Sequence, residues 1–351
     1  MEEWIEQLVH PLNGVQLALL IVAALFSVGK GADVLVDEAV ILAKRWGMPT
    51  LLIGATIVSL GTTAPEAAVS VLAAIQGKPG LALGNAVGSV ICDTGLILGI
   101  AALLRPLPLN RQVVNRQGWI QVGAGFLLVL ACLPFSHLGD VFSTGGNMPQ
   151  LVGLGFLVLL GVYMWLTISW ARKSGVREPK EAIDEGDEES SSVFLVLVKL
   201  VLGIAVVIVS SWILIPSVGE AAVRMEIPDG IIAATLVALG TSLPELVTAV
   251  TATLKGHGEL AVGNIIGADI LNVLFVAGAS AAVTTDGLDA PVDFFKFQFP
   301  AMLAVLVIFR LGIAFSGKEL GRGFGLLLLA VYAVYIGLTV AYFTGGAGAA
   351  P

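Results

Sequence analysis

A glutamate and several hydroxyl side chains occur together inside an apolar run at two places in the chain. Residues 61–66 read GTTAPE, and 179 residues later residues 240–245 read GTSLPE. Carboxylate, hydroxyl and carbonyl oxygens are the hard ligands that Ca²⁺ and Na⁺ prefer. A charged side chain inside an apolar span is costly and marks an ion or substrate pathway by default. These two stretches are therefore the first candidates for a cation-binding site.

Proline residues in these stretches predict how the glutamates are held. Pro65 and Pro244 directly precede Glu66 and Glu245, and proline suits the first turn of a helix that resumes after a break. Non-helical backbone at membrane depth is tolerated where it is buried or lines a cavity. We therefore expect each glutamate near the N-terminus of a half-helix, with unwound carbonyls facing the same cavity. Helix capping could explain one such glutamate, but the duplication favours a binding role.

Polar side chains also form a stripe on the apolar stretch that follows each motif. In the first half they recur every four residues and share one helix face: Asn85, Ser89 and Asp93. The equivalent positions in the second half hold Asn264, Ala268 and Asn272. The asparagines suit either hydrogen bonds between helices or ion binding, whereas an unpaired carboxylate such as Asp93 needs a cation. Asp269 is open to both interpretations, because it points about 60° away from Asn272.

The composition is that of a polytopic membrane protein. Hydrophobic residues make up 57% of the 351 residues, charged residues only 13%, and the mean hydropathy is +0.94. A soluble domain is about half apolar and a quarter charged. The net charge of −8 argues against nucleic-acid binding. Cys92 and Cys132 lie in apolar runs, and we expect them to be buried free thiols rather than a disulfide.

Hydrophobic runs long enough to cross a bilayer predict an all-α polytopic membrane protein with ten transmembrane helices. The first five runs are Val15–Leu42, Thr50–Ile75, Leu81–Leu104, Trp119–Phe135 and Leu151–Trp170. The last five are Val193–Val218, Ile231–Leu254, Leu260–Val283, Phe297–Ala314 and Phe324–Phe343. Alternate loops hold 13 lysines and arginines on one side and 3 on the other, so the positive-inside rule places both termini outside the cytoplasm.

The two motifs belong to a longer internal repeat. At the same offset Thr56 aligns with Thr235, and the glycines at 84 and 88, whose spacing predicts close helix packing, align with those at 263 and 267. We expect residues 1–170 to form a first five-helix repeat with its motif region at 61–93, and residues 193–351 to form a second with its motif region at 240–272. Because five is odd, the repeats must be inverted. Residues 171–192 predict an acidic cytoplasmic linker; Ca²⁺ sensing is the alternative, but EF-hand spacing is missing.

The quoted motifs resemble those of a known family. The paired GT[ST]xPE and GNxxG sequences are similar to the two internal repeats of the cation/Ca²⁺ exchanger superfamily, and the chain resembles its prokaryotic Na⁺/Ca²⁺ exchangers over essentially its whole length. The resemblance implies that Glu66 and Glu245 are the central Ca²⁺ ligands. It implies further ion-site residues, namely Thr62, Thr63, Thr241, Ser242, Ser89, Asp93 and Asn272, with backbone carbonyls near Ser59 and Ala238 joining the Na⁺ sites.

Two departures from the family pattern bear on the coupling ion. Asp269 follows Ala268 where the second motif usually continues with Ser-Asn, so Asp269 is a further candidate ion ligand. Asp93 and Asn272 place acid and amide in opposite repeats from the arrangement associated with archaeal relatives. These departures concern the coupling ion and the number of ions rather than the fold.

The sequence thus indicates a secondary antiporter, not an enzyme, that exchanges Ca²⁺ for Na⁺ by alternating access in a prokaryotic inner membrane. Its expected partners are these ions and the lipid bilayer, with no cofactor, nucleic acid or obligatory protein partner. A Ca²⁺/H⁺ or K⁺-dependent exchanger of the same fold is the alternative. The sequence TAPE at 63–66 argues against H⁺, since proton-coupled relatives typically carry an Asn-Ala-Thr-Glu type motif, while Asp269 argues for it. A passive channel and an intramembrane hydrolase are disfavoured, because a channel requires no inverted repeat and no histidine lies within the GTTAPE or GTSLPE motif.

Overall fold

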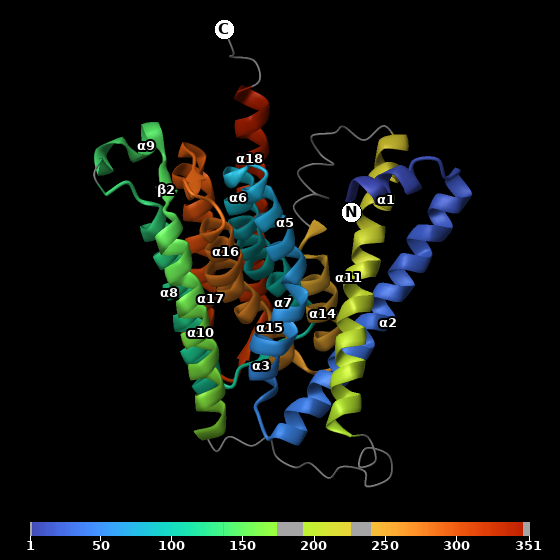
Figure 1. Ribbon diagram of the computed structural model, residues 1–351. Helices are drawn as coiled ribbons and strands as arrows, with labels where there is room; N and C mark the ends of the chain where they lie inside the picture. Colours follow the sequence, from blue (N-terminus) through green and yellow to red (C-terminus); the bar gives the residue numbers. More distant parts are fainter. Residues whose placement is uncertain (1, 136, 174–191, 226–239, 347–351) are drawn as a thin grey trace.

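The structure is a computed structural model of the chain, and it describes residues 2–135, 137–173, 192–225 and 240–346. These residues form a bundle of long helices, several of which are broken (Figure 1). Within the described ranges, seven helices are long and apolar enough to cross a membrane, or eight if one bent pair is counted as a single span. The chain is therefore a multi-pass membrane protein.

Two of the longest helices stand as a pair at one side of the bundle (Figure 1). They are α2, Gly14–Trp46, and α11, Val193–Arg224, and they pack against each other along much of their length. Large apolar side chains such as Phe26 and Val201 are exposed on them, and an extended apolar surface of this kind suits contact with lipid.

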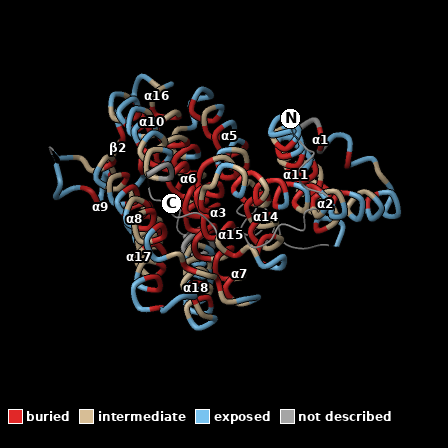
Figure 2. The backbone as a smooth tube through the Cα atoms, turned by 90° about the horizontal axis from the view of Figure 1, so that it is seen from below, coloured by how far each residue is buried: buried red, intermediate tan, exposed pale blue. Residues whose placement is uncertain are grey.

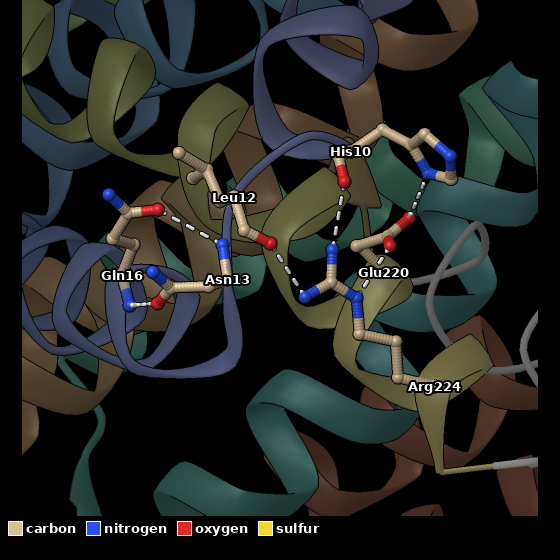
Figure 3. Close-up of polar contacts among 6 residues, drawn as sticks. All are labelled: His10, Leu12, Asn13, Gln16, Glu220 and Arg224. Carbon is tan, nitrogen blue, oxygen red and sulfur yellow. Dashed lines mark hydrogen bonds and ion pairs between the residues drawn. The ribbon is translucent and has the colours of Figure 1, made fainter.

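A short N-terminal helix, α1 (Glu2–Val9), packs against the end of this pair. Arg224, the last residue of α11, donates hydrogen bonds to the carbonyls of His10 at 2.9 Å and Leu12 at 2.8 Å (Figure 3). The same guanidinium forms an ion pair with Glu220 at 2.7 Å, and the His10 ring contacts Glu220 at 3.1 Å. The link between α1 and α2 is thus held against α11.

Both motif glutamates lie just beyond a break in a helix. The first break follows α3 (Thr50–Ile53), the π-helical turn η1 (Gly54–Val58) and α4 (Ser59–Thr62), and it precedes α5 (Ala64–Ile75), with a bend of 45°. The second follows Ser242, after which α14 (Leu243–Leu254) begins. The first part of the seventh predicted run, which includes Thr235 and Ala238, lies outside the described residues.

After α5 and after α14 the chain turns back, and the next helical segments run through the middle of the bundle, where buried residues are concentrated (Figure 2). The first return comprises α6 (Pro79–Ile91), η2 (Cys92–Ile97) and α7 (Leu98–Leu104). The second comprises α15 (Gly258–Leu271), η5 (Asn272–Ala277) and α16 (Gly278–Ala282). The segments η2 and η5 are π-helical turns, which are frequent at functional sites, and they contain Asp93 and Asn272.

Glycines of α15 let this helix pack tightly against the first broken helix. A Cβ added to Gly263 would lie 2.1 Å from the carbonyl oxygen of Leu51, and one added to Gly267 would lie 2.6 Å from the carbonyl oxygen of Ala55. The predicted packing role is confirmed at these two glycines. The prediction is wrong at Gly84 and Gly88, because a Cβ at Gly84 would make an ordinary 3.7 Å contact with the Phe294 ring and one at Gly88 would meet no atom within 4 Å.

The remaining helices cover the side of the bundle opposite α2 and α11 (Figure 2). They are α8 (Arg111–Cys132), α10 (Gln150–Lys173), η6 (Phe294–Gln298) with α17 (Phe299–Phe315), and α18 (Arg322–Gly346). The connections before and between these helices hold η3 (Leu138–Asp140), α9 (Val141–Thr144) and four short strands, β1 (Leu107–Pro108), β2 (Gly146–Met148), β3 (Leu288–Ala290) and β4 (Glu319–Leu320). Strand β1 pairs antiparallel with β4, and β2 with β3. The sequence did not predict these strands.

A helix coincides at least in part with every predicted run, but the count of ten spanning helices remains a prediction. Helix α8 is not apolar enough, and the described part of α14 is not long enough, to count as a span. The inverted repeat also remains a prediction, and most of the predicted linker at 171–192 lies outside the described residues. Cys92 and Cys132 are buried and free, as predicted.

Candidate ion-binding site

Glu66 is completely buried in the first turn of α5, directly after Pro65. Neither of its carboxylate oxygens has a hydrogen-bond partner among the described residues. The helix N-terminus supplies a partial positive charge, but a buried carboxylate also needs a cation or a full set of hydrogen bonds to compensate for its lost hydration. The position of Glu66 therefore favours a bound cation.

Glu245 has the equivalent position in the first turn of α14, after Pro244, and is also completely buried. Its Oε1 accepts a hydrogen bond from the hydroxyl of Thr63 at 3.3 Å, while Oε2 has no partner in the described part of the chain. Thr63 lies at the first helix break, so this hydrogen bond joins the two breaks. Glu66 and Glu245 are close enough to repel each other electrostatically.

Asp93 brings a third buried carboxylate to the same region. Both of its oxygens lack hydrogen-bond partners within the described residues. Asp93 is close enough to Glu66 and Glu245 for the negative charges to repel each other. The hydroxyl of Ser242 lies near Asp93 without meeting hydrogen-bond geometry. Asn272, at the equivalent place in the second half, is buried with both amide atoms unpartnered in the same ranges. Three acids thus share one buried region, and nearby amide and hydroxyl groups remain available to an ion.

Threonine and asparagine side chains connect the broken helices to the central ones. Thr62 Oγ1 lies 3.4 Å from Asn264 Oδ1, and Thr241 Oγ1 lies 3.2 Å from Asn85 Oδ1. Asn85 also donates from Nδ2 to Ser70 Oγ at 2.9 Å and to the backbone carbonyl of Glu66 at 3.3 Å. Of the two interpretations of the asparagines, the structure shows hydrogen bonds between helices for Asn85 and Asn264, but none for Asn272 within the described residues.

Ser59 and Ser89 are both buried, and their roles at the ion sites remain predictions. Ser89 is buried one helical turn before Asp93. The backbone carbonyl of Ser59 accepts hydrogen bonds from Thr63 N at 2.8 Å and Thr62 Oγ1 at 3.4 Å, so it is less freely available than an unwound carbonyl. The carbonyl near Ala238 lies outside the described residues.

Asp269 is buried but makes contacts of a different kind. Its Oδ2 accepts hydrogen bonds from the hydroxyl of Thr94 and from Gln121 Nε2 of α8. The sequence analysis did not single out either partner. A usable signal was present, because Gln121 is a polar residue inside the fourth apolar run and Gln117 lies four positions earlier, just before that run begins.

The geometry limits how an ion could be held. Within the described residues, no three His, Cys, Asp or Glu side chains gather closely enough to hold one metal ion. An ion between Glu66 and Glu245 would therefore take its other ligands from hydroxyl, amide or carbonyl oxygens. Ca²⁺ accepts such mixed oxygen ligands, so the residues present fit a transported Ca²⁺.

The fold and these buried acids define a multi-pass membrane carrier for cations. The chain belongs to the sodium/calcium exchanger protein family, whose model matches residues 16–169 and 195–341. It is 35% identical over 325 residues to the inner membrane protein YrbG of Escherichia coli, covering 92% of this chain and 95% of that protein. It is 30% identical to the sodium/calcium exchanger MaX1 of Methanosarcina acetivorans, covering 91% and 97% of the two chains.

A solved structure shows the same fold. The sodium-calcium exchanger NCX_Mj superposes with a TM-score of 0.75 at 25% identity, covering 92% of this chain and 98% of its own. Together with the family match, this makes the chain a cation/Ca²⁺ antiporter.

Proposed function

We propose that this antiporter exchanges Ca²⁺ for Na⁺, with Glu66 and Glu245 as the central Ca²⁺ ligands. The observation that carries the proposal is the pair of buried glutamates at two helix breaks, with three of their four carboxylate oxygens unpartnered in the described part of the chain. The names of MaX1 and NCX_Mj, both sodium/calcium exchangers, support the choice of ions.

Antiport follows from the charge of the empty site. Glu66, Glu245 and Asp93 repel one another when no cation is present. One Ca²⁺ would balance two of these three charges, and each Na⁺ would balance one. The two loads compete for the same oxygens, so they cannot be carried together. Alternating access then gives exchange, because the protein can change the side to which the site opens far more readily when a cation offsets the buried charge than when the site is empty.

We further propose which groups complete the sites. Thr62, Thr63, Thr241, Ser242 and Ser89 supply hydroxyl or backbone oxygens, and carbonyls near Ser59 and Ala238 serve Na⁺. Asp93 and Asn272 supply one acid and one amide from equivalent positions of the two halves. An H⁺- or K⁺-coupled exchange is the second candidate, and the additional buried acid Asp269 favours H⁺ coupling.

The same proposal includes the membrane arrangement. Ten spans would form two inverted five-helix halves, with both termini outside the cytoplasm and residues 171–192 inside. The matched contacts Thr62–Asn264 and Thr241–Asn85, which relate positions 179 residues apart, support two equivalent halves.

Uptake of radioactive Ca²⁺ into proteoliposomes tests the coupling ion. The purified protein is reconstituted, and an outward gradient of Na⁺, of K⁺, of H⁺, or of Na⁺ and K⁺ together is imposed at equal ionic strength. We expect concentrative Ca²⁺ uptake with the Na⁺ gradient alone. Uptake that follows only the H⁺ gradient would show that the Na⁺ assignment is wrong, and a requirement for K⁺ together with Na⁺ would identify the K⁺-dependent alternative.

A further inference from the structure

Asp269 belongs to a compact polar cluster that the Glu66–Glu245 pair does not use. Besides the two hydrogen bonds to Asp269 Oδ2, Gln121 Nε2 lies 3.2 Å from Thr94 Oγ1, so each of the three side chains contacts the other two. They come from three helical segments, α15, η2 and α8. Asp269 and Gln121 are each 1% exposed, and Thr94 is 0% exposed. The cluster is therefore built into the interior of the bundle.

No positive charge balances this cluster in the described part of the chain. The ion pairs there join other residues, and the charged groups that interact with Asp269 are Asp93 and Glu245, both acids. Asp269 Oδ1 and Gln121 Oε1 have no hydrogen-bond partner among the described residues. Two unused oxygens beside a buried, uncompensated carboxylate favour a bound cation.

The available ligands select the class of cation. Ca²⁺ usually takes about 6–8 oxygens, often from several carboxylates, whereas this cluster offers one carboxylate, one hydroxyl and one amide. A single carboxylate balances a single positive charge. The amide of Gln121 carries both donors and an acceptor, so a rotation about its Cγ–Cδ bond exchanges the N–H that faces Asp269 for an oxygen.

We propose that Asp269, Gln121 and Thr94 form a binding site for a monovalent cation, Na⁺, separate from the site between Glu66 and Glu245. In the empty site the Gln121 amide donates to the carboxylate, and in the loaded site its oxygen faces the ion. The proposal rests on the proposed function only in that Na⁺ is an ion the exchanger carries. Because Thr94 directly follows Asp93 in η2, a cation here also offsets the repulsion between Asp269 and Asp93.

Equilibrium binding of radioactive Na⁺ to the purified full-length protein, without Ca²⁺, tests this site. Asp269→Asn removes the charge at nearly constant shape, and Gln121→Leu removes the amide. Gln117→Leu is the matched control, because Gln117 lies one turn earlier on α8, is also 1% exposed, and has an unpartnered Oε1 within the described ranges. Gln117 donates to Thr167 at 3.4 Å rather than to an acid.

We expect Asp269→Asn and Gln121→Leu each to bind about one Na⁺ fewer per chain than the parent, because one carboxylate balances one monovalent ion. The control should bind as many as the parent. Retained binding of radioactive Ca²⁺, measured without Na⁺, shows that a variant is folded. If Gln121→Leu does not fold, the Na⁺ stoichiometry of Asp269→Asn alone tests the proposal. Unchanged Na⁺ stoichiometry in Asp269→Asn overturns the proposal even if the parent exchanges Ca²⁺ for Na⁺. If the parent shows no Na⁺-driven Ca²⁺ uptake, the proposed function is wrong instead. The number of Na⁺ bound per chain still decides whether the Asp269 site exists.

Discussion

The hydroxyl of Thr62 lies 3.4 Å from Asn264 Oδ1, so a residue at the first helix break contacts the central helix of the other half of the chain. Thr241 is equivalent to Thr62, and Asn85 to Asn264, at the 179-residue offset of the repeat. Thr241 and Asn85 make the reciprocal contact at 3.2 Å. The first break is thereby attached to α15, and the second break to α6. This exchange of partners joins the two halves at equivalent positions, although the hydrogen bonds of the two glutamates themselves differ.

The Thr62–Asn264 contact predicts a measurable coupling in stability. In a double-mutant cycle with Thr62→Val and Asn264→Leu, we expect a coupling of about 0.6 kcal/mol, typical of hydrogen bonds inside membrane proteins. Reversible unfolding in mixed micelles, without Ca²⁺ or Na⁺, measures it. Pairing Thr62→Val with Asn85→Leu is the control, because Asn85 contacts Thr241 instead. Equal, additive effects in both cycles would show that the Thr62–Asn264 contact contributes no stability.

The two glutamates give the most direct prediction for transport. Glu66→Gln or Glu245→Gln should abolish Ca²⁺ uptake without preventing membrane insertion, because a neutral amide oxygen replaces a carboxylate poorly as a ligand of a divalent ion. Uptake in proteoliposomes and the yield of monodisperse protein are measured together. Either variant transporting Ca²⁺ at the parental rate would rule out the paired-glutamate mechanism.

The sequence was a good guide to what local chemistry determines. Pro65 and Pro244 located both helix breaks, and the glutamates were correctly expected in the first turn after each break. The partners of a polar side chain depend on tertiary packing and were harder to predict. The direction of Asp269, away from Asn272, was calculable from helical geometry, but its contacts with Thr94 and Gln121 depend on where α8 packs.

Lys255 predicts a pH-dependent contribution to stability. It follows α14 and forms ion pairs with Asp37 at 2.8 Å and Asp33 at 3.3 Å of α2. Partial burial opposes its charge, but the hydrogen bonds to and charges of Asp37 and Asp33 outweigh that effect and raise the pKa of Lys255. A raised lysine pKa contributes stability that is fully present below the unfolded-state pKa and is lost as the pH rises through the folded-state pKa.

We therefore expect Lys255→Met to lower the free energy of unfolding by about 0.5 kcal/mol at neutral pH, since the pair is partly exposed and screened. The difference from the parent should persist up to the usual lysine pKa of about 10.4 and vanish above the raised value. Lys78→Met, at an exposed lysine for which the described structure shows no ion pair, is the control. A Lys255→Met effect that does not change with pH would contradict this account.

The predicted orientation can be tested by cysteine labelling. The two native cysteines are buried, so they should give little background with an impermeant thiol reagent. Ser191→Cys, in the predicted linker, should react only when the reagent reaches the cytoplasmic side, as the 13-to-3 distribution of basic residues requires. Labelling of Ser191→Cys from the outer side of intact cells would show that the true orientation is opposite to the predicted one.

Asp93 and Asn272 allow a test of whether two equivalent positions face one ion site. Both are buried and lie in matching π-helical turns, and only Asp93 carries a charge. Asp93→Asn should weaken Ca²⁺ uptake and reduce the number of Na⁺ exchanged, because the site loses one of its negative charges. Adding Asn272→Asp should restore part of both, since it returns the charge at the equivalent position of the other half. The control adds Gln117→Asp to Asp93→Asn, which returns a buried charge outside the acid cluster and should restore neither. If the two double variants behave alike, Asp93 and Asn272 do not share a cavity, and the acid has a structural role in its own half of the chain.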